Sequence, residues 1–152
     1  MERKIVEPMT VLYAEQELTI PEVAIFGQQY RAEFTQEVEK YGLRVVGPWI
    51  FISYHLPKNG RDRYRAEFCL PLGNGEAYAG GKFPIKSLSR FPCAFVEYNG
   101  KLRQLFTKGY QPLVREIAAA KMSFTGESRE VYHSWIGPNS TENRIEIQFG
   151  VA

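Results

Sequence analysis

The chain has 152 residues, which suffices for one domain or for two fused half-domains that bury roughly two-thirds of the unfolded surface. Its 19 basic and 17 acidic residues are well mixed and give a formal net charge of +2, so there is no basic stripe for nucleic acid to contact. No stretch approaches the about 18 consecutive apolar residues of a membrane-spanning helix, and the N-terminus lacks an export signal. We therefore expect a cytoplasmic protein without direct nucleic-acid or membrane contacts.

The first half of the chain predicts a strand, a helix and a hairpin. Residues 9–18 are rich in strand formers, and a helix is predicted to open at Pro21, where the missing N–H does no harm. Strands over 49–56 and 64–72 are separated by a Lys-Asn-Gly turn, which indicates a hairpin. Before them, apolar residues recur at helical spacing until Gly42: Phe26, Tyr30, Phe34, Val38 and Tyr41.

The second half repeats this plan. A strand over 91–98, a turn at Asn99-Gly100 and a helix are followed by strands over 129–136 and 143–151. Pro112 should kink the helix, because it removes a backbone hydrogen bond and crowds the preceding turn. Residues 73–88 are predicted to connect the halves. Their glycine-rich beginning has no periodicity and leaves a mobile flap as an open alternative.

The two halves also match each other directly, at an offset of about 80 residues. We therefore predict a single α+β domain over 1–152, built from two pseudo-symmetric βαββ repeats at about 9–72 and 89–151. The repeats form antiparallel sheet with helices on one face and a ligand cleft between the halves. The matching segments are 25–30 with 105–110, 53–59 with 134–140, and 65–70 with 144–149.

The last strand of each repeat places a glutamate on a defined face. Side chains alternate along a strand, so the apolar residues of each last strand must face the helices. Glu67 and Glu146 are therefore both predicted on the helix-free face. The apolar sets are Ala66, Phe68, Leu70 and Leu72 in the first copy, and Ile145, Ile147, Phe149 and Val151 in the second.

Aromatic residues of the neighbouring strands suggest what these glutamates do. Five rings cannot all lie under two helices, so several should line the cleft beside the acids. A buried carboxylate among ring faces attracts cations, because the charge is costly to desolvate and the rings add about 0.5 to 2 kcal/mol each. Glu130 is a further acid, two residues from a ring. The five rings are Trp49, Phe51, Tyr54, Tyr132 and Trp135.

A plainer interpretation stays open beside this one. Arg65, Arg129 and Arg144 could pair with these glutamates as ordinary surface ion pairs of small energetic worth. Cys69 and Cys93 share no metal or redox spacing and are expected to be buried free thiols, and no cofactor or metal site is indicated.

Several motifs in order resemble the GyrI-like superfamily, also called the AraC/XylS-type effector-binding domain. The resemblance covers residues 9–151. It depends on Gly47-Pro48 before an aromatic strand, the turn at 97–100 before the helical segment 105–117, the sequence "EVY" at 130–132, and the closing strand 144–151.

The resemblance implies two βαββ units around a ligand cleft with an acid at its base that receives cationic drugs. Carried onto this chain, the acid of the penultimate strand is Glu130, with Tyr132 beside it, and the acid of the last strand is Glu146. Only about eight residues precede the first predicted strand, so a stand-alone member without a helix-turn-helix domain is expected. The turn Tyr98-Asn99-Gly100 departs from the His-x-Gly common in the family, which affects the shape of the pocket.

The favoured function is binding of hydrophobic, cationic small molecules, linked to transcription regulation. The resemblance implies two alternatives: a hydrolase that opens strained rings with a cleft Glu and Tyr, or a protein-interaction module such as a gyrase inhibitor. A protein partner or a homodimer is also open. Neither His55 nor His133 has a serine or cysteine at a spacing that indicates a nucleophile and its base, which disfavours an enzyme. The candidate ligand-binding residues are Glu130, Glu146, Tyr132, Trp49, Phe51, Tyr54, Trp135 and Glu67.

Overall fold

The computed structural model describes residues 1–78 and 80–152, and these form two compact units. The N-terminal unit is Pro8–Ser89, and the C-terminal unit combines Met1–Glu7 with Arg90–Ala152. Residue 79, which belongs to the predicted connection, lies outside the described residues. Within the described part of the chain, every helix is too short or too polar to cross a membrane.

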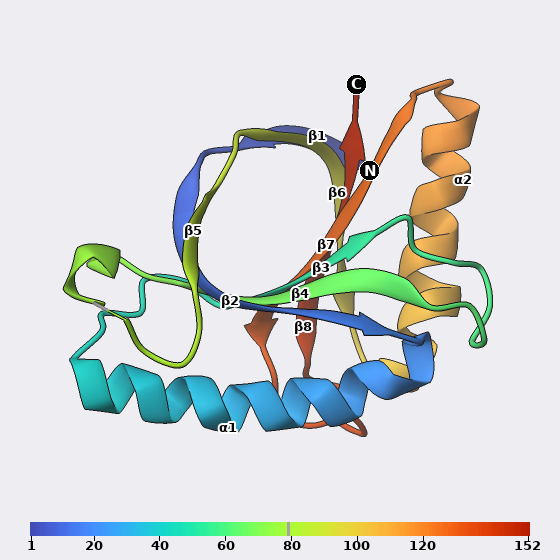
Figure 1. Ribbon diagram of the computed structural model, residues 1–152. Coiled ribbons are helices and arrows are strands. Elements are labelled where there is room, and N and C mark those ends of the chain that lie inside the picture. Colours follow the sequence, from blue (N-terminus) through green and yellow to red (C-terminus); the bar gives the residue numbers. More distant parts are fainter. Residues whose placement is uncertain (79) are drawn as a thin grey trace. The chain divides into compact units, whose positions relative to one another are not determined.

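The N-terminal unit is an antiparallel sheet with a long helix on one face (Figure 1). The order of its strands is β3-β4-β2-β5. Aromatic side chains of α1 hold the helix on the sheet, since Tyr30 lies 5.1 Å from Phe68 and Phe34 stacks on Trp49 at 5.5 Å between ring centroids. The elements are β2 (Met9–Leu18), α1 (Val23–Tyr41), β3 (Trp49–Tyr54), β4 (Tyr64–Pro71) and β5 (Ile85–Leu88).

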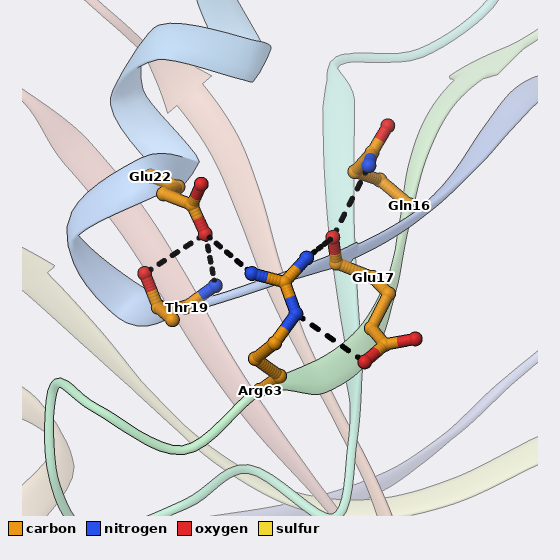
Figure 2. Close-up of polar contacts among 5 residues, drawn as sticks. All are labelled: Gln16, Glu17, Thr19, Glu22 and Arg63. Atoms are coloured by element: carbon orange, nitrogen blue, oxygen red, sulfur yellow. Dashed lines mark hydrogen bonds and ion pairs between the residues drawn. The ribbon is translucent and has the colours of Figure 1, made fainter.

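A small polar network fixes the 3-10 turn Ile20–Glu22 that leads into α1 (Figure 2). The Glu22 carboxylate accepts hydrogen bonds from the Thr19 backbone N–H at 2.8 Å and from the Thr19 hydroxyl at 3.0 Å. Arg63, from the loop before β4, reaches this carboxylate at 3.4 Å and donates to the Glu17 carbonyl at 3.0 Å. The helix ends at Gly42, whose φ of 61° suits a residue without a side chain, as the sequence predicts.

The C-terminal unit has the same plan, with strand order β1-β6-β8-β7, and all its described strand pairs are antiparallel. Both units thus confirm the predicted α+β class with antiparallel sheet. The strands are β1 (Glu2–Val6), β6 (Phe91–Asn99), β7 (Phe124–Ser134) and β8 (Arg144–Val151), and α2 (Gln111–Ala119) is the α-helix of this unit (Figure 1).

The helical segment of the C-terminal unit is divided into three parts around Pro112. A 3-10 turn over Leu102–Gln104 and a π-helical turn, η4 (Phe106–Tyr110), precede α2. Pro112 lies in the first turn of α2, where its missing N–H removes no α-helical hydrogen bond. The chain therefore accommodates the proline by changing helix type before it. π-Helical turns occur frequently at functional sites.

Two strands were missed by the sequence analysis. β1 lies before the first predicted strand, and β5 lies inside the predicted connection. Neither strand pairs with the strand that follows it in the chain. β1 precedes β2 but pairs with β6, and β5 precedes β6 but pairs with β2. Neither strand shows period-two alternation, which explains why sequence patterns did not find them.

The described part of the connection is anchored to α1, which disfavours a mobile flap. The Tyr78 hydroxyl donates to the Glu37 carboxylate at 2.6 Å, and the Lys82 backbone N–H donates to the same group at 3.2 Å. The Lys82 ammonium also reaches Glu33 at 2.9 Å. Glu37 is only 8% exposed, so these bonds satisfy a carboxylate that has little access to water.

Candidate functional site

The repeated glutamates lie on the helix-free faces, as predicted. In β4, Phe68 contacts Tyr30 of α1, so its neighbour Glu67 points to the other face. In β8, Phe149 contacts Tyr110 of η4 at 5.6 Å, so Glu146 likewise points away from the helices.

Glu67 is already neutralised by cations of its own unit. It is 1% exposed, and the Lys86 ammonium of β5 lies 2.5 Å from its carboxylate. The Tyr54 hydroxyl donates to the carboxylate at 2.7 Å, and the Arg65 guanidinium lies 3.7 Å away. The Lys86 ammonium also sits 4.3 Å from the centre of the Tyr13 ring. Lys86 and Arg65 therefore neutralise the Glu67 carboxylate within its own unit.

Glu146 has an equivalent arrangement in the C-terminal unit. The Lys4 ammonium of β1 lies 2.5 Å from its carboxylate and 4.3 Å from the centre of the Phe95 ring. Gln148 donates to the carboxylate at 2.6 Å, and a ring nitrogen of His133 lies 3.2 Å away. Burial raises the pKa of Glu146, but the hydrogen bonds from Lys4, Gln148 and His133 together outweigh it and leave the pKa below its ordinary value.

The repeated carboxylates therefore serve the same purpose in both units. Each binds a lysine from a strand that the sequence analysis missed, and each lysine also lies over an aromatic ring. Neither Glu67 nor Glu146 needs an external cation to neutralise it.

Glu130 lies on the opposite face from Glu146 and has different partners. It pairs across β7 and β8 with Ile147, on the helix side. One carboxylate oxygen accepts a short hydrogen bond from the Tyr110 hydroxyl, and the other accepts one from the Tyr132 hydroxyl at 2.5 Å. The Trp135 ring packs edge-on against Tyr132 at 5.6 Å. We call Glu130, Tyr110, Tyr132 and Trp135 the Glu130 cluster.

The Glu130 cluster holds a carboxyl group in apolar surroundings. Glu130 is 8% exposed, and burial raises the pKa of its carboxyl group, although the two phenol hydrogen bonds act in the opposite direction. Among the described residues, no lysine, arginine or histidine forms an ion pair with Glu130, whereas Glu67 and Glu146 each have a lysine. Of the three predicted acids, Glu130 is the one whose charge the described residues leave unneutralised.

The N-terminal unit has no such acid at the corresponding positions. The repeat alignment that matches Ser53 with Ser134 places Trp49 opposite Glu130 and Phe51 opposite Tyr132. Trp49 stacks on Phe34, and Phe51 lies 5.0 Å from Phe68. The structure thus places both residues on the helix side of the sheet, with Phe51 buried and Trp49 half-buried, away from the helix-free face on which the cleft was predicted.

The predicted site residues therefore separate into distinct groups. Tyr54 lies with Glu67, and Tyr132 and Trp135 lie with Glu130. Sequence reasoning missed Tyr110, although its position matches Tyr30 in the repeat alignment. Cys69 and Cys93 are buried and form no disulfide, as expected. The described residues contain no cluster of metal-ligating side chains.

No model of a protein family matches the chain, and no curated protein matches it. Solved structures do resemble it. The C-terminal domain of EcmrR gives a TM-score of 0.78 at 21% identity, covering 99% of this chain and 96% of that domain. EcmrR in its complex with DNA gives the same TM-score and identity, but this chain spans only 56% of that protein.

Two further structures have lower identity. SAV2435 bound to tetraphenylphosphonium gives a TM-score of 0.66 at 12% identity, covering 100% of this chain and 94% of that chain. A hydrolase from Listeria innocua gives a TM-score of 0.65 at 12% identity, covering 99% of this chain and 91% of that chain. At these identities the likeness shows the fold alone: this chain has the fold of the EcmrR C-terminal domain and of SAV2435.

Proposed function

We propose that the chain binds lipophilic cations at the Glu130 cluster, with Glu130 as the counter-charge. The observation that carries the proposal is the difference between the three acids. Glu67 and Glu146 each lie 2.5 Å from a lysine ammonium, whereas the described contacts of Glu130 are two phenol hydroxyls.

The physical reason is the cost of an uncompensated buried charge. An ionised carboxylate in apolar surroundings is stabilised only in part by two neutral donors, so it gains from an arriving positive charge. A lipophilic cation also buries its own apolar surface, and ring faces such as those of Tyr132 and Trp135 attract it further. A hydrophilic ion would lose its hydration without gaining the burial of apolar surface that offsets this loss for a lipophilic cation.

Known relatives in fold support the proposal. SAV2435 was solved with tetraphenylphosphonium, a lipophilic cation, and EcmrR was solved in complex with DNA. By analogy, we propose that this domain senses such a molecule in the cytoplasm and passes the signal to transcription through a separate DNA-binding partner or segment.

A second candidate is hydrolysis, which one observation favours. The carboxyl group of Glu130 has a raised pKa and lies beside a phenol O–H, a pair that could act as general base and proton donor. The fold is also shared with a hydrolase from Listeria innocua. Turnover of a strained-ring electrophile that disappears in Glu130→Gln would establish this candidate.

The binding proposal is tested by titrating the protein with tetraphenylphosphonium in a calorimeter. Glu130→Gln keeps the shape but removes the charge, and should weaken binding by about tenfold or more. Glu97→Gln is the matched control in the same unit, because Glu97 is exposed and pairs with Arg144. Absence of binding by a panel of lipophilic cations to the folded protein would end the proposal.

A further inference from the structure

We infer that the Glu130 cluster selects cations that carry no N–H donors, and that Tyr132 sets this selectivity. The inference rests on the proposed function and names its ligand class: quaternary ammonium and phosphonium ions and comparable N–H-free cations, in preference to protonated amines of similar shape. It follows from how the chain holds its own ammonium groups.

The two lysines at Glu67 and Glu146 show what an ammonium needs. Each uses a carboxylate and a ring face, and each is partly open to water, with 30% of the Lys86 side chain and 38% of the Lys4 side chain exposed. An ammonium has three N–H donors, so the donors that do not reach the carboxylate can bond to water. Both sites therefore satisfy charge and hydrogen bonding together.

The Glu130 cluster offers charge with less hydrogen-bonding capacity, and less water, than an ammonium needs. Glu130 is 8% exposed, so water has little access to a group bound beside it. Each carboxylate oxygen already accepts a phenol O–H, from Tyr110 on one side and Tyr132 on the other, so one of the two lone pairs on each oxygen is used. A protonated amine placed here would leave N–H donors poorly satisfied, which is unfavourable in a buried site. A quaternary cation has no such donors to satisfy.

Tyr132 is the residue on which this selectivity depends. Its hydroxyl, from the same strand β7, uses one lone pair of Glu130 Oε1, whereas the Tyr110 hydroxyl reaches Oε2 from η4. Replacing Tyr132 by phenylalanine keeps the ring for cation contacts and frees that lone pair to accept a further N–H from the ligand. The change should therefore favour protonated amines over quaternary cations.

The test compares benzylammonium with benzyltrimethylammonium, which differ in three N–H against three N–CH₃ groups. Affinities for both are measured by calorimetry in the wild-type protein, in Tyr132→Phe and in Tyr78→Phe. The last variant is the matched control, since it removes a tyrosine hydroxyl from the buried Glu37 carboxylate in the other unit. Because the same two ligands are compared throughout, their difference in hydrophobicity cancels when affinity ratios are compared between proteins.

We expect the wild-type protein to prefer the quaternary ion by about tenfold or more, and Tyr132→Phe to reduce that ratio at least about threefold. Tyr78→Phe should leave the ratio unchanged. Equal binding of both ions, or the same ratio in wild type and Tyr132→Phe, would overturn the inference. So would binding of tetraphenylphosphonium but of neither benzyl cation, because the site would then select by size.

If no cation binds, the proposed function itself fails. If Tyr132→Phe does not fold, Tyr110→Phe, which frees the other oxygen, takes its place.

Discussion

Lys4 and Glu146 form an ion pair at 2.5 Å although they lie near opposite ends of the chain. The pair joins β1 to β8 across β6, which is hydrogen-bonded to both strands. Lys86 and Glu67 repeat it in the N-terminal unit, across β2. These two pairs fix the edge strands to the centre of each sheet, and they decide which glutamate is left for a ligand.

Lys4→Met should destabilise the protein by about 1 to 2 kcal/mol, because it leaves Glu146 buried with only Gln148 and His133 as described partners. The expected destabilisation is modest because the Lys4 side chain is 38% exposed and water partly screens the ion pair. Urea unfolding at neutral pH measures the change. The double variant Lys4→Met/Glu146→Gln should recover much of the loss; a double variant as unstable as the single one would show that packing of the lysine stem matters more than charge.

Glu130 should make the protein less stable as the pH rises. Its pKa in the folded chain is raised above the ordinary 4.5, so the stabilisation from the neutral carboxyl is fully present below that value and is lost as the pH passes the folded pKa. Glu130→Gln stays neutral throughout. The stability difference between variant and wild type should therefore move in favour of the variant as the pH rises from 4.5 through the folded pKa of Glu130. Parallel stability curves for the two proteins would contradict the assignment of a raised pKa.

Binding of tetraphenylphosphonium should show the opposite dependence on pH. The ligand requires ionised Glu130, so affinity should increase as the pH rises above 4.5 and level off once the folded pKa is passed. The charge of the ligand does not change over this range, which isolates the titration of the protein. Calorimetry in buffers of different ionisation enthalpy should detect proton release on binding, and Glu130→Gln should release none. Affinity that is constant with pH would place the ligand elsewhere.

Tyr78→Phe should loosen the connection between the repeats. The hydroxyl of Tyr78 bonds to buried Glu37, and burial together with this bond raises the pKa of Tyr78 to about 12. Loss of the bond should cost about 1 to 3 kcal/mol locally, because the Lys82 backbone N–H alone then remains to Glu37. Limited proteolysis should cut residues 73–88 faster in the variant. Unchanged cleavage would mean that the connection is held by its other contacts.

The duplication and the strand faces could be predicted because they are local properties. Strand side chains alternate with a period of two, so an apolar set that includes Phe149 and faces the helices requires Glu146 to lie on the opposite face. The end of α1 at Gly42 was predictable for a similar reason, since a left-handed residue at that point favours glycine.

Pairing of charges could not be predicted, because it depends on strands that come together from distant parts of the chain. Lys4 and Lys86 lie in β1 and β5, short edge strands without alternating apolar residues, so no pattern indicates either of them. Tyr110 reaches Glu130 from a π-helical turn before Pro112, a change of helix type that helical periodicity does not predict. The sequence by itself determined the repeats, the fold class and the faces, since backbone periodicity carries that information. The tertiary structure alone decided which of three acids keeps an unneutralised charge, since a buried charge is defined by the neighbours that folding brings to it.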